Sequence, residues 1–254
     1  MIHFVGAGSG AADLVTVRGA RLLGEADVII YAGSLVNPAL LDYAKEGAEI
    51  HNSAHMTLEE VIDCMKVAEA QGKMTVRLHT GDPCLYGAHR EQMDLLDEVG
   101  IEYDVVPGVS SFCGAAAALN AEYTLPNVSQ SVIITRMEGR TSVPDGEKLR
   151  LMASHGCTMV LFLSTSLLEG AVEELLAGGA YTADTPAAIV YKATWPDEKV
   201  WRCTLGTLVE TAKEAGVKNT ALITIGGFLG DAYDRSRLYD PTFTHMFRQG
   251  TENL

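Results

Sequence analysis

The chain has 254 residues, 47% of them hydrophobic, which is enough to bury one large core or two ordinary ones. It carries 19 Lys and Arg against 33 Asp and Glu, and the resulting net charge of −14 repels nucleic-acid phosphates, so no nucleic-acid partner is expected. No export signal opens the chain and no apolar stretch approaches the roughly 20 residues of a membrane span. The five widely spaced cysteines form no C-x-x-C pair. We therefore expect a cytoplasmic protein without a membrane anchor or a bound metal.

Short β-branched runs alternate with helical patterns in the first half of the chain. Strands are predicted at 2–5, 28–31, 75–78 and 103–106, and helices at 17–23, 57–71, 91–99 and 108–119. This alternation is typical of an α/β domain with a largely parallel sheet. The domain is predicted to span 1–120, and a segment with a proline and no periodicity, 121–129, is the predicted linker.

A second α/β domain is predicted over 130–254. Its strands are expected at 131–135, 159–163, 187–191, 199–204 and 221–225, with helices at 146–153, 167–177 and 207–215. The link between the third and fourth of these strands is too short for a crossover helix, so this pair should be antiparallel. The second domain is therefore predicted to hold a mixed sheet.

The first predicted strand ends in a glycine-rich loop with Gly6, Gly8 and Gly10, which formally satisfies the G-x-G-x-x-A pattern of dinucleotide-binding folds. Such a loop normally opens directly into a helix, whereas Asp13 to Thr16 intervene here before the helical pattern begins. The second strand also supplies no carboxylate for a ribose. These departures disfavour an NAD-dependent dehydrogenase, and a tight turn that needs glycine explains the loop better.

Two further motifs follow successive predicted strands. The first contains Thr80-Gly81-Asp82-Pro83, and the second runs from Val106-Pro107-Gly108 to Ser110-Ser111. Together with the glycine-rich start they resemble the tetrapyrrole methyltransferase family, over nearly the whole chain except its terminal tail. The segment Ala193-Thr194-Trp195-Pro196 resembles the branch that methylates carbon 11 of precorrin-4 or cobalt-precorrin-4 in cobalamin biosynthesis. The sequence departs from the family at Ser9, where proline is frequent, and at Ala32, where some members have an aspartate that is proposed to accept a proton.

The resemblance implies a two-domain fold with the ligand cleft between the domains, S-adenosylmethionine as methyl donor and a homodimer. Methyl transfer from a sulfonium depends mainly on positioning and requires no metal. Donor-binding residues carried over from the family are Thr80, Gly81, Asp82, Leu85, Ser110, Ser111, Leu163, Ala193, Thr220 and Ala221. Asp82 and Glu91 are the candidates for catalytic roles, Glu91 as a proton-handling group, although a carboxylate in a helix's first turn commonly stabilises the helix dipole.

The implied substrate is a macrocycle fringed with carboxylates, so basic and hydrogen-bonding side chains should line the cleft. The substrate-binding candidates are Ser9, His79, Tyr86, Arg90, Arg136 and Lys192, and Arg77 is expected near the same strand ends. Two alternatives stay open at this point. One is a methyltransferase for another tetrapyrrole, such as uroporphyrinogen or another precorrin. The other is a tetrapyrrole-binding protein without catalytic activity, which would have no use for the Thr80–Pro83 donor motif.

Overall fold

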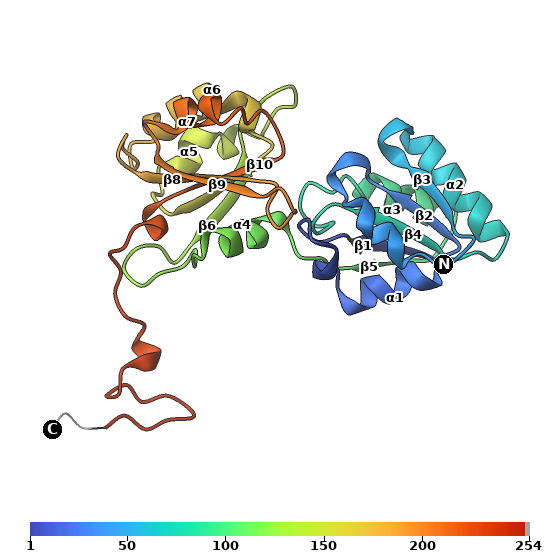
Figure 1. The fold of residues 1–254 in the computed structure, drawn as a ribbon, viewed down its shortest axis with the longest axis horizontal. Coiled ribbons are helices and arrows are strands. Elements are labelled where there is room, and N and C mark those ends of the chain that lie inside the picture. The colour runs from blue at the N-terminus through green and yellow to red at the C-terminus, as the bar shows by residue number, and fades with distance from the viewer. Residues whose placement is uncertain (252–254) are drawn as a thin grey trace. The chain divides into compact units, whose positions relative to one another are not determined.

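A computed structural model of the chain describes residues 1–251 and divides it into two compact units (Figure 1). Unit 1 consists of Met1–Ala115 together with Lys192–Glu198, and unit 2 of Ala116–Tyr191 together with the chain from Lys199 onward. The segment Lys192–Glu198 thus belongs by its contacts to unit 1, although both of its chain neighbours belong to unit 2. The predicted domain boundaries stay a prediction, and residues 252–254 of the predicted second domain lie outside the described residues.

Unit 1 is built on a five-stranded parallel sheet with the strand order β3-β2-β4-β1-β5. Its strands are β1 (Ile2–Gly6), β2 (Val28–Tyr31), β3 (Glu49–Asn52), β4 (Thr75–His79) and β5 (Tyr103–Val106), and its helices are α1 (Val17–Glu25), α2 (Leu58–Ala70) and α3 (Arg90–Glu98). Parallel strands point their carboxyl ends to one edge of the sheet. The loops after β1, β4 and β5 therefore lie at the same edge.

Both faces of this sheet are covered, which explains why β1 and β4 are buried over their whole length. Val5 packs with Leu22 of α1 in the core on one face. On the other face, Phe4 packs with Met65 of α2 and Leu96 of α3. A doubly covered sheet leaves only its ends accessible, so binding residues are expected at the strand ends.

Unit 2 holds a mixed five-stranded sheet with the order β6-β7-β10-β8-β9. Its strands are β6 (Val132–Arg136), β7 (Thr158–Phe162), β8 (Pro186–Tyr191), β9 (Lys199–Thr204) and β10 (Ala221–Ile225), and helices α5 (Leu149–Ala153), α6 (Leu168–Ala177) and α7 (Leu208–Glu214) gather on one side of it (Figure 1). Only β6 and β7 pair in parallel, and the other neighbours are antiparallel. Helix α4 (Ser111–Leu119) crosses from unit 1 into unit 2.

Short 3-10 turns complete the chain at Ala12–Leu14, Gly33–Leu35, Pro38–Tyr43, Ser53–His55, Asp145–Glu147, Thr165–Leu167, Gly227–Leu229 and Arg237–Tyr239. The predicted linker, 121–129, has neither helix nor strand, but Tyr123 in it is buried and its ring lies 5.0 Å from that of Phe228. The segment is therefore packed against unit 2 rather than extended through solvent.

The predicted fold class, a largely parallel sheet followed by a mixed one, is confirmed, as is the antiparallel pairing of β8 with β9. Three details were wrong, and one of them is the start of α4, which begins at Ser111 and not at residue 108. Strand β3 was missed, because an edge strand with two exposed residues shows little hydrophobic alternation. Helix α5 is shorter than predicted, since Lys148 is extended at φ −56° and ψ 139° and separates it from the preceding turn.

No helix within residues 1–251 is both long and apolar enough to cross a membrane. Within the same residues, no group of three or more His, Cys, Asp or Glu side chains is placed to hold a metal ion. All five cysteines are free thiols.

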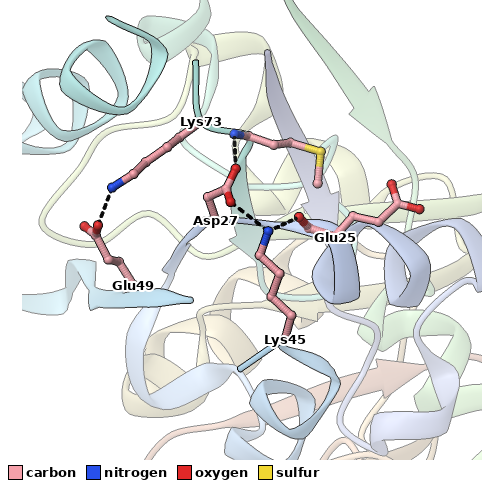
Figure 2. Close-up of polar contacts among 6 residues, drawn as sticks. Glu25, Asp27, Lys45, Glu49 and Lys73 are labelled. Carbon is pink, nitrogen blue, oxygen red and sulfur yellow. Dashed lines mark hydrogen bonds and ion pairs between the residues drawn. The ribbon is translucent and has the colours of Figure 1, made fainter. Parts of the chain in front are cut away.

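A polar cluster closes the amino-terminal end of the unit 1 sheet, opposite the loops that follow the strands (Figure 2). The carboxylate of Asp27, just before β2, accepts hydrogen bonds from the ammonium group of Lys45 at 2.7 Å and from the backbone N–H of Met74 at 2.8 Å. Lys45 also donates to the carbonyl of Glu25 at 2.9 Å, and Lys73 pairs with Glu49. Asp27 thereby ties the end of α1 to the start of β4. The bond from Lys45, followed by that from Met74, lowers the pKa of Asp27.

Replacing Asp27 with asparagine should lower the melting temperature at pH 7, because the ion pair with Lys45 is lost. The folded-state pKa of Asp27 lies below its unfolded value, so its contribution is present above about pH 4 and disappears as the pH falls through the folded pKa. The gap between the two melting curves should therefore close in acid. Glu46→Gln removes the same charge from an exposed side chain and serves as the control. An equal loss in both variants, or a gap that stays constant with pH, would contradict this role.

Candidate functional site

Three loops meet at the carboxyl edge of the unit 1 sheet, and backbone hydrogen bonds join the loops after β1 and β4. The N–H of Ala7, after β1, donates to the carbonyl of His79 at the end of β4 at 2.7 Å. Gly8 and Gly81 exchange two hydrogen bonds, of 3.2 Å and 3.0 Å. The glycine-rich loop and the Thr80–Pro83 motif, which are 70 residues apart in sequence, therefore form one backbone framework.

The contact between these loops requires glycine. A Cβ atom on Gly6 would lie 2.6 Å from the Cα of Gly108, in the loop after β5, and a Cβ on Gly108 would collide with the carbonyl oxygen of Gly81. Gly81 itself has φ +62°, a conformation that side chains disfavour. Any larger residue at positions 6 or 108 would push the three loops apart.

Asp82 fastens the second loop to the third. One of its carboxylate oxygens accepts the N–H of Cys84 at 2.8 Å and the other accepts the N–H of Gly108 at 2.9 Å. Partial burial raises the pKa of Asp82, but the hydrogen bonds from Cys84 and Gly108 outweigh that effect and lower it overall. A carboxylate with a lowered pKa is a weak proton acceptor, so the geometry favours binding and loop-holding over acid–base catalysis for Asp82.

The other donor-site candidates of unit 1 adjoin this framework. Thr80 and Leu85 are half-buried on either side of the Gly81 turn, and Ser110 is 7% exposed. The carbonyl of Ser110 accepts the N–H groups of Cys113 and Gly114, so that Ser110 and Ser111 form the amino-terminal turn of α4. Predicted donor residues from the loops after β4 and β5 thus share one edge of the sheet.

The structure corrects the expected position of Arg77. Its side chain is 6% exposed, and its guanidinium donates to the Gln92 side chain and to the carbonyl of Ile30, both at 3.1 Å. Burial lowers its pKa to about 10, so it remains charged at neutral pH. Arg77 therefore lies in the core beneath α3, where its residue type alone had suggested a cleft.

His79 is also buried, with 2% of its surface exposed. Its ring lies 5.9 Å from that of Phe4 and 5.6 Å from that of His89, and its Nε2 atom has no hydrogen-bond partner among the described residues. Burial, followed by the charges of Arg77 and His89, lowers the pKa of His79 to about 3. The ring is therefore neutral at pH 7 and carries no positive charge.

The segment that leads into α3 carries three more candidates. Tyr86 is 47% exposed and has φ +54°, in the left-handed region. Arg90 is largely exposed and pairs with Asp94 at 2.6 Å along the helix. Glu91 is exposed in the first turn of α3. Of the three, only Tyr86 combines exposure with an unusual backbone conformation, which is frequent at functional sites.

The segment Lys192–Glu198 brings two predicted residues into unit 1. Ala193 is 5% exposed, and the ammonium group of Lys192 lies 2.6 Å from the carboxylate of Asp197. The neighbouring Thr194 contacts the hydroxyl of Ser9 at 3.0 Å. No role was predicted for Thr194, because a contact across 185 residues leaves no signal in the local sequence.

Four predicted residues gather at one end of the unit 2 sheet. In the strand register Arg136 pairs with Phe162, Leu163 follows directly, and Ala221 pairs with Tyr191 on the adjoining strand β8. Leu163 (φ +51°) and Thr220 (φ +53°) are both left-handed, and Leu163 is 64% exposed. The guanidinium of Arg136 donates to the carbonyls of Thr141 at 3.1 Å and Ser142 at 2.6 Å, and so also orders its own loop.

A cavity of about 420 Å³ lies within unit 2, between α6 and α7. Its lining includes Met137, Leu167, Val209 and Lys213 but none of the predicted site residues. The cavity nevertheless adjoins the strand-end group, because Met137 follows Arg136 and the hydroxyl of Thr165 donates to the carbonyl of Ala221 at 3.1 Å.

Comparison with known proteins gives a consistent result. The model of the family described as Tetrapyrrole (Corrin/Porphyrin) Methylases matches residues 1–209. A protein of Methanocaldococcus jannaschii named cobalt-precorrin-4 C(11)-methyltransferase is 54% identical over 98% of this chain and 96% of its own length.

Two solved structures are also similar. A cobalamin biosynthetic enzyme, cobalt precorrin-4 methyltransferase, superposes with a TM-score of 0.88 at 47% identity, over 91% of this chain and 96% of that one. Uroporphyrin-III C-methyltransferase of Thermus thermophilus, in complex with S-adenosylhomocysteine, gives a TM-score of 0.75 at 26% identity, over 90% and 98%. The chain belongs to the tetrapyrrole methylase family.

Proposed function

We propose that this protein transfers the methyl group of S-adenosylmethionine to carbon 11 of precorrin-4 or cobalt-precorrin-4 in cobalamin biosynthesis. The observation that carries the proposal is the glycine framework at the carboxyl edge of the unit 1 sheet, with Asp82 bridging two of its loops. Because glycine has no side chain, the backbone N–H and C=O groups of this framework can contact a ligand directly. The names of its relatives support the acceptor, since the precorrin-4 enzymes are far more similar to this chain than the uroporphyrin enzyme is.

The methyl donor fits this framework because the Gly81 turn leaves main-chain groups of Thr80 and Asp82 beside the half-buried side chain of Leu85. S-adenosylmethionine supplies a methyl carbon on a positively charged sulfur, which leaves without a proton. The protein therefore contributes mainly by holding the donor methyl group and the acceptor carbon in line. The high effective concentration of the two bound reactants accounts for most of the rate acceleration. Ser110 and Ser111 would bind from the loop after β5, with Ala193, Leu163, Thr220 and Ala221 from the second half of the sequence.

The carboxylates of the tetrapyrrole require local positive charge in a protein of net charge −14. Arg136 is the last residue of β6 and Lys192 directly follows β8, and we assign both to these carboxylates. Ser9, His79 and Tyr86 would add hydrogen bonds, and Arg90 an exposed charge. The exposed carboxylate of Glu91 is proposed to accept the proton that the methylated carbon releases, directly or through water.

Two other functions fit less well. A dinucleotide site would need a helix that opens directly from the glycine loop, whereas Val15 and Thr16 are extended before α1 begins. A tetrapyrrole-binding protein without activity would not need Asp82 to hold the Gly81 loop. We also propose a homodimer located in the cytoplasm, and light scattering that gave the mass of a single chain would contradict the dimer.

Calorimetric titration with S-adenosylhomocysteine should show binding in the micromolar range, while NAD in parallel should give no heat. S-adenosylhomocysteine retains the groups that the backbone framework would bind, and it avoids the need for a scarce tetrapyrrole. Binding of NAD without S-adenosylhomocysteine would overturn the proposed activity.

Replacing Asp82 with alanine should weaken S-adenosylhomocysteine binding by about tenfold or more, since two charge-assisted hydrogen bonds are lost, one within its own loop and one to the loop after β5. Asp63→Ala, on the exposed face of α2, is the matched control and should bind normally. Titration of both variants checks the assignment. Unchanged affinity in the Asp82 variant would remove Asp82 from the donor site.

Replacing Arg136 with alanine should raise the KM for the tetrapyrrole about tenfold, because the half-buried guanidinium that is proposed to bind a substrate carboxylate is lost. The affinity for S-adenosylhomocysteine should stay unchanged. Arg140, exposed in the same loop, provides the control variant Arg140→Ala. Since Arg136 also orders residues 137–142, thermal melting should accompany the kinetics. A normal KM in folded Arg136→Ala protein would exclude Arg136 from substrate binding.

A further inference from the structure

The hydroxyl of Thr194 joins the segment Lys192–Glu198 to the glycine-rich loop within unit 1. Its oxygen accepts the N–H of Ala11 at 3.0 Å and lies 3.0 Å from the hydroxyl oxygen of Ser9. The N–H of Thr194 donates in turn to the Glu198 carboxylate at 2.6 Å. A single side chain thus contacts both the backbone of the glycine loop and the only hydroxyl that this loop presents.

Close packing accompanies these hydrogen bonds. A Cβ on Gly10 would lie 2.6 Å from the indole nitrogen of Trp195, so only glycine allows the ring to cover the loop. On the other side, a Cβ on Gly114 would lie 2.9 Å from the Ser9 side chain and 3.2 Å from the methyl group of Thr194. Gly114 therefore could not carry a side chain without displacing Ser9 or Thr194.

Thr194 occupies this place in an unfavourable backbone conformation. Its φ is +66°, where a β-branched residue is a rare outlier and glycine or asparagine would be relaxed. Such strain persists only where the surroundings determine it, and it concentrates at functional sites. The backbone alone does not favour threonine here, which points to the hydroxyl as the group that the position needs.

The hydrogen-bond donors and acceptors of the Ser9 and Thr194 hydroxyls indicate the role of the Thr194 hydroxyl. Each hydroxyl has one proton and two acceptor sites. Thr194 uses an acceptor site for Ala11, and its own proton can go to the Ser9 oxygen, which is either donor or acceptor in their contact. In that arrangement the Ser9 proton is left for an external acceptor, and a carboxylate is the acceptor that a hydroxyl binds most strongly.

We propose that Thr194 is a positioning residue that acts through Ser9: it donates to Ser9 and thereby directs the Ser9 hydroxyl proton to a carboxylate of the tetrapyrrole. This inference rests on the proposed function, because it takes a carboxylate-bearing macrocycle as the acceptor. It goes beyond it by assigning substrate orientation to a residue that does not itself touch the substrate.

Thr194→Val and Thr194→Ser form the matched pair that tests this role. Valine keeps the shape and removes the hydroxyl, so the KM for precorrin-4 should rise about tenfold while the KM for S-adenosylmethionine stays unchanged. Serine keeps the hydroxyl and should restore the KM of the unaltered protein. A merely structural role would affect both substrates together and would not distinguish the two variants in this way.

A double-mutant cycle with Ser9→Ala measures the coupling between Thr194 and Ser9 in precorrin-4 binding. If Thr194 acts through Ser9, Thr194→Val should add no further loss of precorrin-4 binding in the Ser9→Ala background. Losses that multiply in the double variant, or Thr194→Ser protein as impaired as Thr194→Val, would overturn the proposal.

Hydrogen exchange separates this inference from the proposed function. The Ala11 amide should exchange faster in Thr194→Val than in Thr194→Ser, whether or not the protein methylates precorrin-4. An inactive unaltered protein with the expected exchange pattern would refute the proposed substrate but retain the Thr194 contact. Equal protection of Ala11 in both variants would refute the contact itself.

Discussion

The backbone contact among the loops after β1, β4 and β5 is the constraint on which the candidate site depends. Gly6 and Gly108 approach too closely for any Cβ atom, and Gly81 adopts a left-handed turn between them. Asp82 then joins the second loop to the third by accepting the N–H of Gly108, and it accepts the N–H of Cys84 within its own loop. The parallel sheet makes this possible, because it brings the ends of β1, β4 and β5 to one edge and buries both faces beneath helices.

Several residues other than glycine adopt left-handed backbone conformations in the loops that hold the candidate site residues. Tyr86, Leu163 and Thr220 were assigned to ligand binding from the sequence, and each has a positive φ, as does Thr194 beside the glycine loop. Conformations of this kind are costly for residues with a Cβ atom, and they survive where the surrounding structure holds them. Their coincidence with strand-end loops supports the assignment of those loops to ligand binding, independently of residue type.

Burial divides the basic residues into two groups with different chemistry. Arg77 and His79 lie beneath α3, where burial lowers both pKa values, and His79 becomes neutral as a result. Arg136 and Lys192 lie at the ends of strands of the mixed sheet, and both are half-buried. A carboxylate forms its strongest hydrogen bonds with cations that it can reach, so the proposed assignment of substrate carboxylates uses the second group.

The sequence by itself determined the fold class, the family and nearly all strands and helices. Hydrophobic periodicity is a local property, and the glycine, Thr80–Pro83 and Val106–Ser111 motifs are contiguous in the chain. Only the tertiary structure decided that Arg77 belongs to the core, that Asp82 reaches Gly108, and that Thr194 contacts Ser9. These facts depend on burial and on contacts between residues far apart in sequence, and the residue types around each position do not encode them.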